Sequence, residues 1–296
     1  MRIEGIEVPV PDGRIAAWRL GDAANGAPEV VAIHGITATS RSWLAVAEAL
    51  GSRAALITPD LRGRGASAPV GPPFGIDGHV RDVLALLDEL GLARPVIAGH
   101  SLGAYIACRF AVRYPDRVRS LVLVDGGLPI PGLPPGADPA TLLGPVVRRL
   151  REEFADRGAY RAWWAAHPAF GDGDVDPRIL DAYADYDLCG EPPRMRSSVR
   201  PEVVPVDGDD VMRARDAAEL GCDAVALHAP RGLNGEPPPM QPEEIVATWV
   251  AQAPGRRRAV AVPDTNHYTI AMGRRGAAVV ADEIASATLR ADAMSG

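Results

Sequence analysis

The pentapeptide GHSLG at residues 99–103 carries a serine, Ser101, in a setting suited to nucleophilic chemistry. It follows an apolar run typical of a buried strand and precedes a helical period that starts at Leu102. G-x-S-x-G between a strand and a helix is a nucleophile elbow, a tight turn that lifts the serine hydroxyl over the carboxyl edge of a sheet. The alternative is a serine that only caps the helix, which needs no outward hydroxyl. The context favours Ser101 as a nucleophile.

A serine hydroxyl reacts only when a neighbouring base removes its proton. Of the six histidines, His267 lies between the last predicted strand and the last predicted helix. That position brings it to the same edge of the sheet as Ser101. His228, at the end of another strand, is the rival. We predict that His267 is the general base and acid.

The segment HGIT, His34 to Thr37, leaves another apolar run. Attack on a carbonyl builds negative charge on its oxygen, and preorganised backbone amides stabilise that charge. We predict that the amides of Ile36 and Leu102 form this oxyanion hole. His34 and Gly35 are predicted to lie against the substrate. A tight turn with a hydrogen-bonded imidazole is the alternative for these two residues.

The elements that position these residues alternate between strands and helices, which predicts an α/β fold with a mostly parallel sheet. The sequence predicts a hairpin of residues 3–8 and 14–20, and strands at residues 30–34, 54–58, 95–98, 120–124, 224–228 and 259–262. Helices are predicted at residues 80–90, 102–113, 211–220, 242–251 and 274–289.

The alternation stops between residues 128 and 205, where the chain becomes rich in Pro and Gly and then helical and aromatic. We predict an inserted helical cap at 128–205, with helices at 142–154, 160–164 and 179–186, on a core of 1–127 and 206–296. Aromatic side chains of the cap, Trp163, Trp164 and Tyr186 among them, are predicted to shape a mostly apolar substrate pocket. The alternative is that they form only the cap's own core.

Composition excludes several classes of protein. The 296 residues carry a net charge of −7, which argues against a nucleic-acid partner. No apolar run is long enough to cross a membrane. Acidic residues stand near the N-terminus where a signal peptide would be apolar, so we expect a cytoplasmic location.

Three cysteines without CxxC spacing indicate neither disulfides nor a zinc site. Two arginine runs, at 148–151 and 256–258, are predicted to be solvated faces.

In order along the chain, HG, DLRGRGAS at 60–67, GHSLG and the late His267 follow the pattern of one superfamily. From Val30 onward the chain resembles an α/β-hydrolase-fold enzyme with a serine nucleophile, of the esterase, lipase or thioesterase kind. The resemblance implies a catalytic triad, an inserted cap and no metal or organic cofactor. Ser101 argues against haloalkane dehalogenases and soluble epoxide hydrolases, which usually carry Asp at this position.

The third member of the triad departs from the usual family pattern. Most members place the acid after the strand predicted at 224–228, but there the only carboxylate is Glu236. Asp125, directly after the strand at 120–124, resembles the position that some thioesterases of peptide and polyketide synthases use. It could equally cap a turn before two glycines. We favour Asp125 and keep Glu236 as the alternative acid.

These features predict a serine hydrolase that cleaves a carboxylic ester or a similar small acyl compound through an acyl-enzyme, as a monomer or homodimer. A carbon–carbon bond hydrolase, or a thioesterase or acyltransferase of a biosynthetic pathway, would use the same residues. The alternative from another class is a catalytically silent protein that binds a small molecule on the same scaffold.

Overall fold

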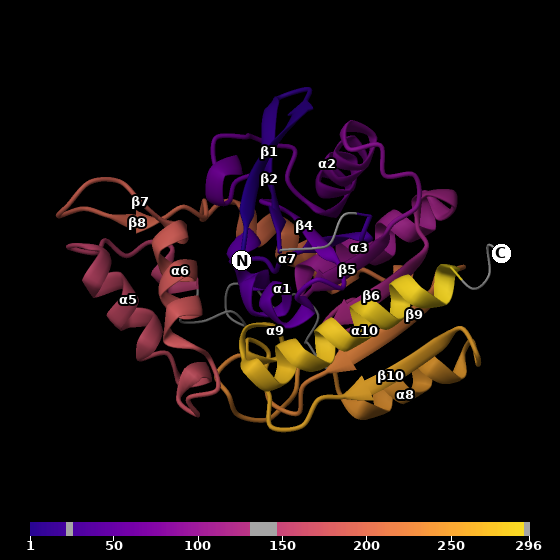
Figure 1. Cartoon of the computed structure of the whole chain (residues 1–296). Helices are drawn as coiled ribbons and strands as arrows, with labels where there is room; N and C mark the ends of the chain where they lie inside the picture. Colours follow the sequence, from indigo (N-terminus) through magenta and orange to yellow (C-terminus); the bar gives the residue numbers. More distant parts are fainter. Residues whose placement is uncertain (22–25, 131–146, 293–296) are drawn as a thin grey trace.

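An eight-stranded sheet forms the centre of the molecule (Figure 1). The computed structural model describes residues 1–21, 26–130 and 147–292. The strands are β1 (Ile3–Val10), β2 (Gly13–Leu20), β3 (Glu29–Ile33), β4 (Ala55–Pro59), β5 (Val96–His100), β6 (Ser120–Val124), β9 (Asp223–His228) and β10 (Arg257–Ala261). They are arranged in the order β1-β2-β4-β3-β5-β6-β9-β10. β1 and β2 are antiparallel to their neighbours, whereas β4, β3, β5, β6, β9 and β10 run parallel to one another.

Helices cover both faces of the sheet, as continuous apolar strands require. In β3, Val31 and Ile33 face one hydrophobic cluster while Val30 and Ala32 face another, which is the period of two expected of a strand. The first cluster packs against α2 (Ile76–Glu89), α3 (Leu102–Arg113) and α8 (Glu243–Ala251). The second packs against α1 (Leu44–Leu50), α9 (Thr269–Met272) and α10 (Arg274–Asp292).

A separate lobe projects to one side of the sheet (Figure 1). It contains α5 (Arg157–Ala165), α6 (Pro177–Asp187) and a short hairpin of β7 (Leu188–Cys189) and β8 (Arg196–Ser197). Its aromatic core also includes Tyr268 and Met272 of the main body. We call this lobe the cap.

The predicted strands of the sheet are all present, with ends shifted by one or two residues. The prediction of a helix at 211–220 is wrong, because α7 spans Val203–Arg213 and a short 3-10 turn follows at Asp216–Glu219. Pro205 lies in the first turn of α7, where no amide donor is needed, so it does not end the preceding cap segment. The proposed cap boundary at 205 therefore falls inside a helix.

The prediction of a helix at 142–154 lies partly outside the described residues. Residues 147–149 are helical, but the helix does not extend to Phe154, which forms an isolated β-bridge with Met195.

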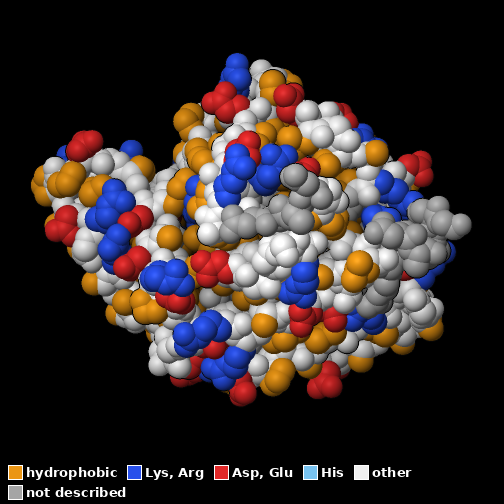
Figure 2. Space-filling view, viewed as in Figure 1, with side chains coloured by type: hydrophobic (Ala, Val, Ile, Leu, Met, Phe, Trp, Pro, Cys, Tyr) orange, Lys and Arg blue, Asp and Glu red, His pale blue; other side chains and the backbone are white. Residues whose placement is uncertain are grey.

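On the surface, arginine and acidic side chains are interspersed over the cap and the body (Figure 2). No helix in the described ranges is both long and apolar enough to span a membrane.

Candidate active site

Ser101 sits in a strained turn between β5 and α3. Its φ of 54° lies in the left-handed region that side chains other than glycine rarely adopt. A Cβ atom on Gly99 would come within 2.3 Å of the Gly103 carbonyl oxygen, and one on Gly103 within 2.0 Å of the Ile33 carbonyl oxygen. The two glycines therefore permit the close packing of strand and helix that holds the turn.

His267 and Asp125 lie in direct contact at the same edge of the sheet. The His267 Nδ1 atom is 2.7 Å from the Asp125 Oδ2 atom, and the other carboxylate oxygen accepts a hydrogen bond from the Ala229 amide at 3.1 Å. The Asp125 side chain is fully buried and that of His267 is almost so. A carboxylate can only accept here, so Nδ1 carries the proton and Nε2 is left as an acceptor. Glu236, the alternative acid, is exposed.

Ser101 lies beside the end of β6, the strand that leads to Asp125. Its amide donates to the Val124 carbonyl, one residue before Asp125, and a Cβ on Gly126 would meet the Ser101 carbonyl oxygen at 2.5 Å. His100, the residue before the serine, has its ring centroid 4.8 Å from that of His267. In this structure the Ser101 hydroxyl has no hydrogen-bond partner among the described residues, and catalytic hydrogen bonds often tighten only when substrate binds.

The HGIT loop lies over the serine. A Cβ on Gly35 would be 3.2 Å from the Ser101 Cβ and 3.7 Å from its Oγ, so glycine leaves room beside the hydroxyl. Within the described part of the chain, the amides of Ile36 and Leu102 donate no hydrogen bond to a protein acceptor. Leu102 begins α3, where helix amides are free to bind an anion. Both amides are therefore available to a negatively charged oxygen.

His34 holds the HGIT loop in place through hydrogen bonds to backbone groups. Its Nε2 accepts from the Leu61 amide at 3.0 Å, so its Nδ1 carries the proton and donates to the Gly35 carbonyl at 2.8 Å. Burial lowers the pKa of His34 to about 3. A neutral, fully buried imidazole with both nitrogens bonded to backbone has no group left for a ligand. The structure gives His34 a bracing role in place of the predicted substrate contact.

Comparisons with known proteins agree with this fold. A family model described as the alpha/beta hydrolase fold matches residues 28–172. The hydrolase of E-2-(acetamidomethylene)succinate superposes with a TM-score of 0.79 at 18% identity, over 97% of this chain and 99% of that one. The chain has the α/β-hydrolase fold.

Two further proteins are similar to this chain. Lipase LipV of Mycobacterium tuberculosis is 35% identical over 170 residues, which are 57% of this chain and 60% of the lipase. The chain thus matches less than two thirds of that relative's length. A thioesterase domain from the curacin biosynthetic pathway superposes with a TM-score of 0.72 at 17% identity, over 96% of this chain and 99% of that domain.

The cap reaches the loop that carries His267, which we call the histidine loop. Tyr268, next to His267, packs against Trp164 and Phe170 with ring centroids 6.3 and 5.6 Å apart. Trp164 is fully buried in the cap core, so it packs and does not provide the predicted ligand contact. Trp163 is half-buried at the edge of the same cluster and remains a proposed substrate contact.

Tyr186 is engaged elsewhere. Its hydroxyl donates to Asp60, the residue after β4, and the Arg41 guanidinium stacks on its ring at 4.1 Å. Asp60 also accepts from the amides of Ser40 and Ala66, at 2.8 and 3.1 Å. Tyr186 therefore anchors α6 to the loops of the main body, and the predicted substrate contact is not supported.

Several residues that hold the site were missed in the sequence analysis. The His100 Nε2 atom donates to the His267 carbonyl at 2.8 Å, and the Asn266 side chain ties the histidine loop to the cap through the Ala169 carbonyl at 2.7 Å. Asn266 also accepts from the amides of Tyr268 and Thr269. An Asn before a short helix is a capping signal, whereas no local pattern marks the partner of His100.

The prediction that the two arginine runs are solvated faces is wrong for Arg257, which is buried, and for Arg149. The Arg149 side chain is fully buried and forms an ion pair with Asp187, Nη1 to Oδ2, at 2.5 Å. Burial acts to lower the pKa of Arg149, but Tyr160 and Asp187 outweigh it and the pKa is raised. A run of charged residues indicates an exposed face only when none of its residues pairs with a buried carboxylate.

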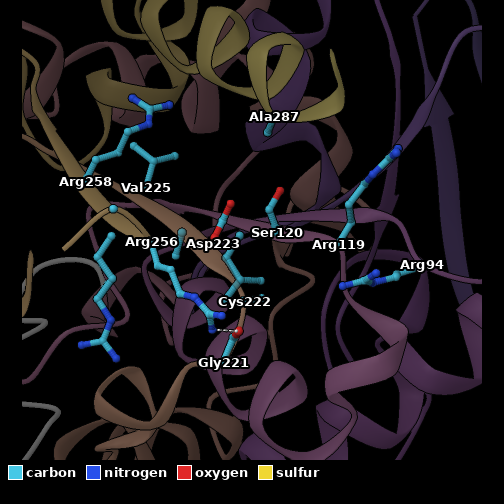
Figure 3. Close-up of a pocket in the computed structure, with 14 residues that line it drawn as sticks. Arg94, Arg119, Ser120, Gly221, Cys222, Asp223, Val225, Arg256, Arg258 and Ala287 are labelled. Carbon is cyan, nitrogen blue, oxygen red and sulfur yellow. Dashed lines mark hydrogen bonds between the residues drawn. The ribbon is translucent and has the colours of Figure 1, made fainter. Parts of the chain in front are cut away.

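A cavity of about 510 Å³ lies at the opposite edge of the sheet, where β6, β9 and β10 begin (Figure 3). Arginines line it, but Arg256 donates to the Gly221 carbonyl, Arg94 to the Val118 carbonyl, and Arg258 is paired with Glu283. Each of these three arginines has a partner within the protein, and Ser101 lies at the other edge of the sheet, so this cavity is not the candidate active site.

Proposed function

We propose that this chain is a serine hydrolase that cleaves a carboxylic ester or a similar small acyl compound through an acyl-enzyme. The observation that carries the proposal is the 2.7 Å contact between His267 Nδ1 and Asp125 Oδ2 beside a strained Ser101. The similarity to a lipase over 170 residues supports it. Fold alone would not, because the same scaffold serves many reactions.

In the proposed first step, the Ser101 Oγ attacks the substrate carbonyl carbon while its proton passes to His267 Nε2. The carbonyl oxygen becomes an oxyanion that accepts from the amides of Ile36 and Leu102. Asp125 stabilises the imidazolium, because its carboxylate already accepts the Nδ1 proton. His267 then gives its proton to the leaving oxygen as the carbon–oxygen bond breaks, and the acyl-enzyme forms.

In the second step, water attacks the acyl carbon while His267 takes its proton. The tetrahedral intermediate collapses, the Ser101 oxygen leaves and recovers that proton, and the acid product is released. The cap lies against the histidine loop through Tyr268 and Phe170. Apolar rings at this position limit the access of bulk water and favour an acyl or alcohol part that is largely apolar.

Fluorophosphonate labelling tests the nucleophile directly. We expect the wild-type protein to gain one phosphonyl group at Ser101, located by peptide mass spectrometry, and Ser101→Ala to gain none. A protein that only binds a small molecule on this scaffold would stay unmodified. Labelling at another residue, or equal labelling of both proteins, would refute the proposed mechanism.

The leaving group is tested with matched substrates. A series of p-nitrophenyl esters of increasing acyl length, with the thioester and the amide of the preferred acyl group, separates an esterase from a thioesterase or an amide hydrolase. We expect the highest kcat/KM on the short to medium esters and none with Ser101→Ala. If the Ser101→Ala variant kept full activity, catalysis would have to come from elsewhere.

A further inference from the structure

Two buried arginines hold consecutive carbonyl groups of the HGIT loop. Arg64 donates to the Ile36 carbonyl oxygen twice, from Nε at 3.1 Å and Nη2 at 3.0 Å. Arg149 donates to the next carbonyl oxygen, that of Thr37, from Nη2 at 2.9 Å. Both guanidinium groups are fully buried. Neither contact is part of the chemistry described above.

Each arginine has its own buried carboxylate. Arg64 pairs with Asp207 of α7, which also accepts from the Gly75 amide at 2.7 Å. Burial alone would raise the pKa of Asp207, but Arg64 lowers it far below its usual range. Asp187 at the end of α6 pairs with Arg149. Breaking a buried pair is costly, yet keeping one adds little net stability over apolar packing, so a positional role is the better explanation of two such pairs.

The partners of Arg149 show what it connects. Besides Asp187, its Nη1 contacts the Tyr160 hydroxyl and the Ser197 Oγ, the latter at 3.0 Å. These residues belong to α6, α5 and β8, all in the cap. Among the hydrogen bonds of Arg149 to described residues, the Nη2 contact to Thr37 is the one that crosses to the main body. Arg149 is therefore fixed by the cap and reaches out of it to the loop beside Ser101.

The loop is constrained at three successive peptide groups. The Gly35 carbonyl accepts from His34 at 2.8 Å and from the Ala38 amide at 3.2 Å, and the arginines hold the next two carbonyls. A trans peptide is planar, with its N–H opposite to its C=O. Fixing the Gly35 carbonyl thus fixes the direction of the Ile36 amide, and fixing the next two prevents the loop from rotating away.

We infer that Arg149 is a positioning residue, which through Thr37 makes the position of the HGIT loop depend on the position of the cap. Arg64 holds the same loop from the main body. The inference rests on the proposed function, in which the Ile36 amide stabilises the oxyanion. Stabilisation of this kind requires donors that are preorganised before charge develops. Loss of the Thr37 contact should impair the transition state more than the binding of substrate.

Arg149→Met tests this inference, with Arg161→Met as the matched control. Arg161 is on α5 of the same cap and pairs with Asp185 at 2.7 Å, but its side chain is 39% exposed. For Arg149→Met we expect kcat to fall by about 10²-fold, as for a misplaced oxyanion donor, while KM changes by less than about threefold. The Arg161→Met variant should resemble the wild type in both constants.

A merely structural role would give a different result. If Arg149 only held the cap together, KM would rise and the affinities for a substrate-like amide and for a trifluoromethyl ketone would fall equally. We expect only the ketone, which forms the tetrahedral oxyanion, to lose affinity, by the same factor as kcat. Equal losses for both ligands, or an unchanged kcat, would overturn the inference.

Arg149→Lys covers the case in which the methionine variant does not fold. An ammonium group retains the charge opposite Asp187 but lacks the planar fork that also reaches Thr37, so kcat should still fall with KM retained. Hydrogen exchange of the amides of residues 35–38 adds a readout independent of activity, and these amides should exchange faster in the variant. If wild-type Ser101 resists fluorophosphonate, the proposed function fails; if the wild type reacts and the Lys variant matches it in kcat and exchange, only this inference fails.

Discussion

Replacing Asp125 by Asn changes one atom of the buried pair and tests its role with little change of shape. In the wild type both carboxylate oxygens accept, one from His267 Nδ1 at 2.7 Å and the other from the Ala229 amide at 3.1 Å. An asparagine has a single acceptor for these two donors. If its oxygen faces Ala229, its NH₂ group faces Nδ1 and forces the imidazole proton onto Nε2. His267 then has no lone pair for the serine proton.

The alternative orientation of the introduced carboxamide restores the correct tautomer but turns an NH₂ group against the Ala229 amide. An unsatisfied buried donor of this kind costs about 1–3 kcal/mol, or roughly 5- to 160-fold in rate. The negative charge that stabilises the imidazolium is absent as well. The wrong tautomer costs about 10⁴-fold in triads of this geometry. We therefore expect kcat to fall by between about 10² and 10⁴.

The assay is kcat and KM on the preferred p-nitrophenyl ester, with circular dichroism to verify the fold and Glu236→Gln as the control. Glu236 is exposed, so its variant should match the wild type. A loss of less than about tenfold in Asp125→Asn together with a large loss in Glu236→Gln would show that the acid has been assigned to the wrong residue.

Packing and burial lead to three further predictions. Gly103→Ala places a Cβ 2.0 Å from a backbone carbonyl at the end of β3, so the free energy of unfolding should fall by about 3 kcal/mol in urea titrations, and an unchanged midpoint would contradict this. Tyr186→Phe removes the hydroxyl that donates to Asp60; it should lower stability by about 1 kcal/mol and leave KM unaltered, whereas a large rise in KM would restore a substrate contact. Burial lowers the pKa of both His34 and His100 from 6.5 to about 3, so the unfolded chain binds protons that the folded one does not. The contribution of these neutral histidines to the free energy of unfolding is complete above pH 6.5. It is lost as the pH falls, by about 2 kcal/mol for each histidine at pH 5. Equal unfolding midpoints at pH 7 and pH 5 would refute this prediction.

The parts of the site that could be predicted are those with local signatures. The elbow around Ser101 can be predicted from five consecutive residues, because its turn needs glycines at fixed positions. The parallel sheet can be predicted from the alternation of strands and helices. The burial of Arg149 could not be predicted, since its partners lie up to 112 residues away. The start of α7 at Val203 was missed, because the helix was predicted to begin only at residue 211. Pro205 is compatible with this start, since the first turn of a helix tolerates proline.

The order of strands explains why an acid after β6 can serve this site. β5 and β6 are neighbours, about 4.8 Å apart as in any sheet, so Ser101 and Asp125 follow adjacent strand ends. His267 arrives from beyond β10, across the end of β9. The residue that follows β9, Ala229, contributes only its backbone amide, and it donates that to Asp125. A carboxylate placed after β9 would lie one strand farther from Ser101 than Asp125 does. In this chain the residue after β9 therefore contacts Asp125 through its backbone amide. The histidine loop, anchored by His100 and Asn266, brings the His267 imidazole to the Asp125 carboxylate.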